Sequence, residues 1–158
     1  MIRREINSEY LNKLLAPGVR SSALDVSGLT DALVRFSKEY LAGVMTLRIE
    51  GFPNGYVMLN TQVLSYLVRL LCTDAKDEPI TCNVVIDDKL TIETTYPNIE
   101  DHEMTSHLIK VAKLVGFKAD RRGDILIFSA DITPSLSMKI YATSTDEIMD
   151  WLVLTYLM

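Results

Sequence analysis

The sequence lacks the features that mark disulfide-rich, metal-binding or membrane proteins: it has few cysteines, no paired metal-ligand spacing and no long apolar run. Its 158 residues include two cysteines, Cys72 and Cys82, which lie in apolar segments rather than at the paired spacing of a zinc site. No stretch approaches the roughly twenty apolar residues of a membrane span, and no apolar signal segment follows Met1-Ile-Arg-Arg-Glu5. These absences predict a soluble, cytoplasmic protein with reduced thiols, no metal and no contact with a membrane.

Positive charge is also in deficit. Sixteen basic and twenty-one acidic residues give a net charge of -5, which disfavours binding to the phosphate backbone of nucleic acids. Hydrophobic residues make up 48% and charged residues 23% of the chain, which is typical of a globular protein. A chain of this length fits a single hydrophobic core. We therefore expect one main folded domain and no nucleic-acid partner.

The middle of the chain predicts helices that alternate with pairs of strands. The segment Asn60–Thr73 is apolar around most of a helical circumference, and Asn60 is a favourable N-cap, so a deeply buried helix is expected. The strands Ile80–Asp87 and Lys89–Thr95 then flank an Asp87-Asp88 turn, and a helix covers about 100–115. The other predicted elements are a helix from Leu29 to Tyr40 with Ser27 as a possible cap, strands at Met45–Glu50 and Tyr56–Leu59, a turn at Asp120–Asp124, and strands at Ile125–Ser129 and Ser135–Tyr141.

This order predicts a two-layer α/β sandwich of the α+β class, with a mixed or antiparallel sheet and its helices on one face. Residues 1–22 are expected to form an N-terminal arm or short helix, with Glu5–Leu15 as the helical part. Residues 23–143 form the main domain. Residues 144–158 form a C-terminal helix, since Ser144 and Glu147 make a capping-box pattern.

Three stretches in this order resemble the ATP-binding domain of sensor histidine kinases and their GHKL (Bergerat-fold) relatives. They are Asp25-Val-Ser-Gly-Leu29, Leu47-Arg-Ile49 and Leu59–Lys76, which contains the buried helix. The hairpin, the helix that ends at Gly116 and the closing strands follow in the family's order, so the resemblance covers about residues 23–143. It implies a histidine-kinase ATPase-like fold and a place in bacterial signalling or regulation.

The sequence departs from this family where the family binds its nucleotide. The resemblance places Thr73, with Arg69 one turn earlier, where the family has the asparagine that coordinates magnesium. Glu93–Asn98 contains neither the aspartate that binds adenine nor the glycines that follow it. In the place of the lid and the glycine-rich turn stand the acidic residues Glu100, Asp101 and Glu103, which would repel a triphosphate. We therefore expect a degenerate pseudoenzyme that has no catalytic residues and no cofactor, with Thr73, Lys76, Thr95 and Tyr96 as candidates for lining a vestigial cleft.

Two short motifs are weaker signals. His102-Glu103 with His107 resembles a zinc motif, but the histidines are five residues apart and so lie about 140° apart around a helix. A solvated first helical turn is the simpler interpretation, and a phosphoacceptor role for His102 is the alternative. Arg121 and Arg122 beside Lys118 could bind an anion, although the flanking aspartates favour a solvated charged turn.

The C-terminal segment Ile148–Met158 is apolar on nearly every side. One interpretation is that part of it contacts a protein partner or a second copy, and the candidate interface residues are Trp151, Leu154, Tyr156 and Leu157. The other is that the helix folds over the open side of the sheet of a monomer. We expect a non-catalytic protein-interaction or regulatory domain whose partner is an unknown protein or a second copy of the chain. The alternative is a domain that binds a small ligand or nucleotide in a remodelled cleft.

Overall fold

The computed structural model describes residues 21–72, 79–95, 102–134 and 143–157, with side chains in α4 from Thr105 onward. The predicted elements Glu5–Leu15 and Ser135–Tyr141 lie outside the described residues, as does most of the predicted N-terminal arm. In chain order the elements are β1 (Ser22–Asp25), α2 (Val26–Tyr40), β2 (Met45–Gly51), β3 (Tyr56–Leu59), α3 (Thr61–Cys72), β4 (Ile80–Ile86), β5 (Lys89–Thr95), α4 (His102–Val115), β6 (Lys118–Arg122), β7 (Ile125–Asp131) and α5 (Thr145–Tyr156).

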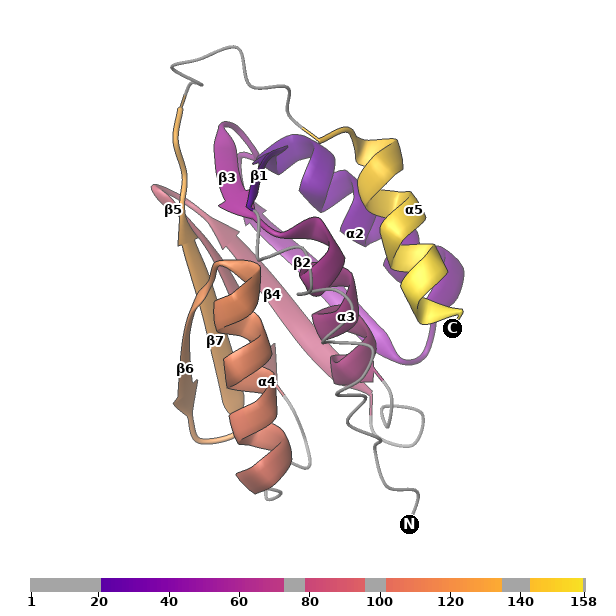
Figure 1. The fold of residues 1–158 in the computed structure, drawn as a ribbon, viewed down its shortest axis with the longest axis vertical. Coiled ribbons are helices and arrows are strands. Elements are labelled where there is room, and N and C mark those ends of the chain that lie inside the picture. Colours follow the sequence, from indigo (N-terminus) through magenta and orange to yellow (C-terminus); the bar gives the residue numbers. More distant parts are fainter. Residues whose placement is uncertain (1–20, 73–78, 96–101, 135–142, 158) are drawn as a thin grey trace.

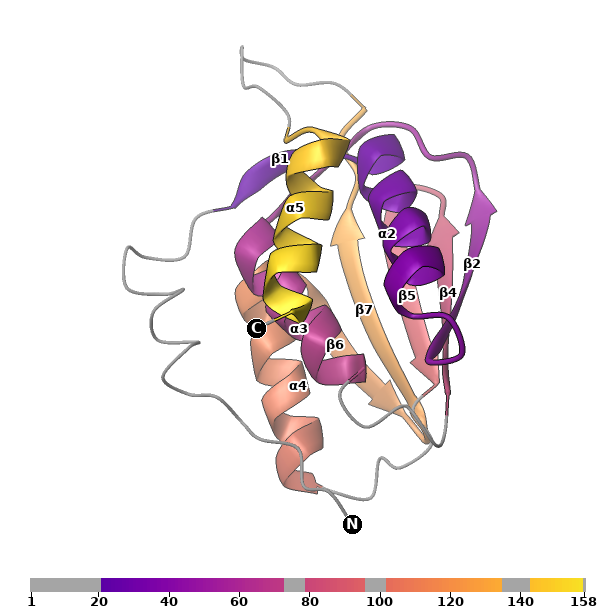
Figure 2. The same ribbon diagram turned by 90° about the vertical axis from the view of Figure 1, so that its right-hand side faces the viewer.

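The main sheet has the strand order β2-β4-β5-β7-β6, in which β2 and β4 are parallel and the other neighbours are antiparallel. Helices α2, α3 and α4 lie on one face of it (Figures 1 and 2). Strands β1 and β3 form a separate antiparallel pair. The predicted mixed α/β sandwich with helices on one face is therefore confirmed.

The core lies between this sheet and the helices. Along β4, alternate residues from Ile80 to Ile86 are buried, and the residues between them face the open side of the sheet. Helix α3 is the most deeply buried helix, as its sequence predicted, with Tyr66 only 1% exposed. The Asn60 side chain accepts a hydrogen bond from the Val63 N–H at 3.1 Å, which confirms the predicted cap.

Helix α2 begins earlier than the sequence predicted. It starts at Val26 rather than near Leu29, and its cap is Asp25, whose carboxylate accepts a hydrogen bond from the Ser27 N–H at 3.2 Å. The expected cap at Ser27 is therefore wrong, because the helix is already formed there and an aspartate stands at the position before it. Strand β1, which ends at Asp25, was not predicted.

The predicted turn at Asp120–Asp124 is also wrong in its extent. Residues Lys118–Arg122 form strand β6, and only Gly123 and Asp124 make the turn. An edge strand with one face open to solvent tolerates charged residues that a central strand would exclude. Gly123 has a φ of 59°, and its carbonyl accepts a hydrogen bond from the Arg121 Nε at 3.0 Å.

Helix α5 does not cover the open side of the sheet, so that interpretation is wrong. It packs against α2 and α3 on their side away from the sheet and adds a further layer to the sandwich (Figures 1 and 2). Ser144 caps it, since its hydroxyl accepts a hydrogen bond from the Glu147 N–H at 3.2 Å, as the capping-box pattern predicted. None of the helices in the described part of the chain is long and apolar enough to cross a membrane.

Candidate functional site

The residues predicted to line a cleft stand in the sequence at or just after the C-terminal ends of α3 and β5, which lie at the same end of the molecule as the start of α4 (Figure 1). Of the four residues predicted to line it, Thr73, Lys76 and Tyr96 lie outside the described residues. Thr95 is exposed and pairs with Thr81 and Ile125 on the open face of the sheet. Its neighbour Thr94 lies on the other face of β5, toward the helices, because side chains alternate along a strand.

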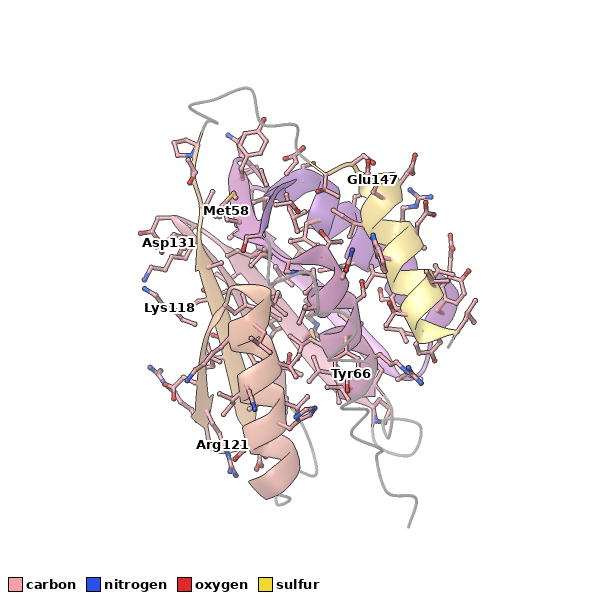
Figure 3. All side chains as sticks on the ribbon, in the orientation of Figure 1. Met58, Tyr66, Lys118, Arg121, Asp131 and Glu147 are labelled. Atoms are coloured by element: carbon pink, nitrogen blue, oxygen red, sulfur yellow. The ribbon has the colours of Figure 1, made fainter. Side chains whose placement is uncertain are left out.

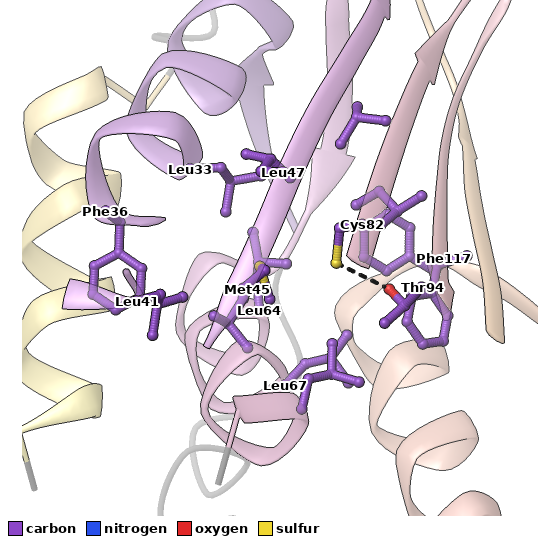
Figure 4. Close-up of a pocket in the computed structure, with 15 residues that line it drawn as sticks. Leu33, Phe36, Leu41, Met45, Leu47, Leu64, Leu67, Cys82, Thr94 and Phe117 are labelled. Atoms are coloured by element: carbon purple, nitrogen blue, oxygen red, sulfur yellow. Dashed lines mark hydrogen bonds between the residues drawn. The ribbon is translucent and has the colours of Figure 1, made fainter. Parts of the chain in front are cut away.

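Thr94 is fully buried and forms a pair with a cysteine. Its hydroxyl lies 3.3 Å from the Cys82 Sγ on the adjacent strand β4, within hydrogen-bond distance (Figure 4). Cys82 and Thr94 occupy opposite positions in the β4–β5 register, which brings both side chains to the inner face of the sheet. Sequence analysis missed this pair, although the alternation of β4 and β5 already places both residues on the core-facing side.

The pair borders a cavity of about 40 Å³ between the sheet and helices α2 and α3 (Figure 4). Its other walls are apolar side chains, among them Phe36, Leu67 and Phe128. The lining residues Leu71 and Thr94 each stand one position before the end of α3 and β5, so the cavity reaches the C-terminal ends of these two elements. Sites for drug-sized ligands have volumes of about 300–1,000 Å³, so this cavity is far too small to hold a nucleotide.

Both cysteines are buried free thiols, as expected. Burial raises the pKa of the Cys82 thiol from 9.0 to about 11, although the hydrogen bond with Thr94 acts in the opposite direction. Burial also raises the pKa of Cys72, and the proximity of Cys82 adds to this shift. Because the thiolate is the nucleophilic form, neither cysteine is suited to covalent catalysis near neutral pH.

His107 lies on α4, five residues after His102. Its Nε2 atom is buried and has no hydrogen-bond partner among the described residues. Burial lowers the pKa of His107, and the nearby Lys110 lowers it further, so the neutral imidazole is favoured at pH 7. The described residues contain no group of three or more histidine, cysteine or acidic side chains that could hold a metal ion.

The basic residues of β6 lie at the edge of the sheet. Figure 3 shows Lys118 and Arg121 on this outer strand. Asp120 stands between them, and Arg122 pairs with Ile125 of β7. Strand β6 therefore carries charges of both signs at the exposed edge of the sheet, as expected for a solvated surface.

The four candidate interface residues on α5 have different environments. Tyr156 packs within the protein, with its ring centroid 5.6 Å from that of Phe36 and in an edge-to-face arrangement. Trp151 is partly buried. Leu154 and Leu157 are exposed, by 59% and 69% respectively. The buried face of α5 consists of Ile148, Met149, Leu152 and Thr155.

No protein-family model and no curated protein sequence matches this chain. Its structure is similar to the cytoplasmic segment of the histidine kinase QseC, with a TM-score of 0.50 and 12% identity over 85% of this chain and 99% of that one. Two weaker likenesses are also histidine kinases. AdeS of Acinetobacter baumannii has a TM-score of 0.43 and 16% identity over 81% of this chain and 77% of that one.

The other is ThkA in its complex with the response regulator TrrA, which has a TM-score of 0.49 and 13% identity over 85% of this chain and 53% of that one. At these identities the likeness concerns the fold alone. The chain shares the fold of the histidine-kinase ATPase-like domains.

Proposed function

We propose that this protein is a non-catalytic interaction or regulatory domain that uses a histidine-kinase ATPase-like fold, in bacterial signalling or regulation. The fold is common to that family, whereas the sequence lacks the family's residues for magnesium, adenine and the phosphates. Thr73 stands in the place of the magnesium-binding asparagine, and the stretch Glu93–Asn98 has no aspartate or glycine. A fold can carry many functions, so function must be argued from the surfaces and sites that remain.

The observation that carries this proposal is the outer surface of α5. The helix is held on α2 and α3 by its buried face, while Leu154 and the C-cap residue Leu157 are exposed. These two leucines are three positions apart and lie on one side of the helix. With the half-buried Trp151 three positions before Leu154, they form an apolar strip of the kind that protein partners bury.

Replacing Leu154 and Leu157 together by lysine tests this strip. We expect the free energy of unfolding to change by no more than about 0.5 kcal/mol for each exposed position. Binding to the partner should weaken by more than about 2 kcal/mol, as expected for central interface residues. Partner binding is measured in the native cell with a photoreactive amino acid at position 154, and stability is measured by urea unfolding.

The matched control places the same photoreactive group at Lys113, an exposed residue of α4. We expect a cross-linked product of defined mass from position 154 that is absent from position 113 and is lost when Leu157 is replaced by lysine. Equal cross-linking from both positions, or none from either, would contradict a partner surface on α5.

The second candidate is a domain that binds a small ligand in the remodelled cleft around Thr73, Lys76, Thr95 and Tyr96. The cavity beside Thr94 is the observation that favours it, because that cavity lies next to the same ends of α3 and β5. Its apolar walls fit a small apolar molecule better than a phosphorylated one. Stabilisation of the protein by such a molecule, unchanged by the two lysine substitutions on α5, would support this second function.

A further inference from the structure

Strand β2 forms an open edge of the main sheet (Figure 2). Among the described residues it pairs only with β4, through a parallel ladder from Met45–Ile80 to Gly51–Ile86. The carbonyl of Val44 accepts a hydrogen bond from the Ile80 N–H at 2.9 Å and so faces β4. Backbone groups alternate in direction along a parallel strand, so those of Leu47 and Ile49 face away from β4, toward the free edge.

The two edges of this sheet differ in how they are protected. At the opposite edge, β6 has four charged residues among its five, an arrangement that opposes pairing with another strand. Strand β2 has seven residues, of which only Arg48 and Glu50 are charged. Both are exposed, and neither has an ion-pair partner among the residues that the structure describes. They lie two positions apart, on the same face of the sheet, and have opposite signs.

We propose that the free edge of β2 pairs in antiparallel register with β2 of a second copy of this chain. In this register Ile49 stands opposite Ile49 of the second copy, on the twofold axis. Each Arg48 then stands opposite the Glu50 of the other copy, so two oppositely charged cross-strand pairs form. The half-buried side chains of Leu47 and Ile49, which already pack against the core, gain further cover.

Charge selects this register over its neighbours. An antiparallel ladder must bring the outward-facing backbone groups of both copies opposite each other, so the register can shift only in steps of two. A shift in one direction places Arg48 opposite Arg48, and a shift in the other places Glu50 opposite Glu50. Like charges directly opposite each other destabilise strand pairing, whereas opposite charges stabilise it. The central register alone pairs both charges favourably.

The test exchanges these charges and measures the dimer dissociation constant by sedimentation equilibrium. The variants are Arg48→Glu, Glu50→Arg and the double variant, which carries both changes. Each single variant puts like charges in both cross-strand pairs, so we expect its self-association to weaken about tenfold or more. The double variant restores opposite charges and should dimerise like the wild type. A mixture of the two single variants should form a heterodimer, because the two chains then complement each other.

Circular dichroism checks that each variant is folded, which is expected because both side chains are exposed. A wild-type protein that is monomeric at every concentration would overturn the proposal. It would also fail if the single variants dimerise as tightly as the wild type, or if the mixture does not associate. The lysine substitutions on α5 should leave this dimer unchanged, so the β2 edge and the α5 surface can fail independently.

Discussion

Replacing Phe36 by alanine is expected to lower the free energy of unfolding by about 3–5 kcal/mol, as for large aromatic side chains removed from a core. Phe36 is 1% exposed and joins two parts of the structure. Its ring stacks on Tyr40, with the centroids 5.2 Å apart, and meets the ring of Tyr156 on α5 edge to face. It also lines the cavity beside the sheet, so its removal enlarges an existing void. The measurement is the urea midpoint together with the slope of the unfolding transition.

The matched control is Phe52→Ala, because Phe52 is 90% exposed in the loop between β2 and β3. The same change in chemistry should cost no more than about 0.5 kcal/mol there. Similar losses at the two positions would mean that Phe36 does not connect the layers as described. A normal midpoint for Phe36→Ala would contradict the position of α5 on the helical layer.

Replacing Gly51 by alanine should cost about 3 kcal/mol, the second large effect. Gly51 ends β2 with a φ of 102°, a backbone conformation that residues other than glycine rarely adopt. A Cβ atom there would overlap the carbonyl oxygen of Ile86, its register partner on β4. The substituted chain must therefore shift the end of β2 as well as bear a strained backbone. Thermal and urea unfolding measure the loss.

Gly43→Ala separates the backbone term from the steric term. Gly43 also has a positive φ, of 78°, but no atom lies within 4 Å of the place where its Cβ would be. Only the backbone strain remains, so the expected loss is about 1 kcal/mol. If the two alanine variants lose the same stability, the close approach of Gly51 to β4 is not as the structure has it.

The sequence predicts best those elements that local chemistry determines. The apolar run after Asn60 could hardly be anything but a buried helix, and Ser144 with Glu147 specified the start of α5. Strand β6 was missed because charged residues dominate it, and only its pairing with β7 makes it a strand. The start of α2 was placed too late because Ser27 and Asp25 are both good caps, and local sequence does not choose between them.

The position of α5 could not be predicted from its sequence. The apolar pattern of a helix shows that it has surface to bury, but not against which part of the protein it packs. The pair of Thr94 and Cys82 needed the register of β4 and β5, which depends on the hairpin as a whole. Of the cleft candidates the structure describes only Thr95, and the alternation of β5 sends its side chain to the open face. The proposed loss of nucleotide binding therefore rests on the sequence, and it needs a direct measurement.

That measurement is a thermal-shift titration of the wild-type protein with magnesium and ATP, with magnesium alone as the control. A nucleotide present at 100 times its dissociation constant would stabilise the fold by about 2.7 kcal/mol, which raises the Tm by several degrees in a domain of this size. A protein without a nucleotide site should show the same Tm with millimolar magnesium and ATP as with magnesium alone. A concentration-dependent rise of several degrees would contradict this account and would show that other residues have rebuilt the nucleotide site.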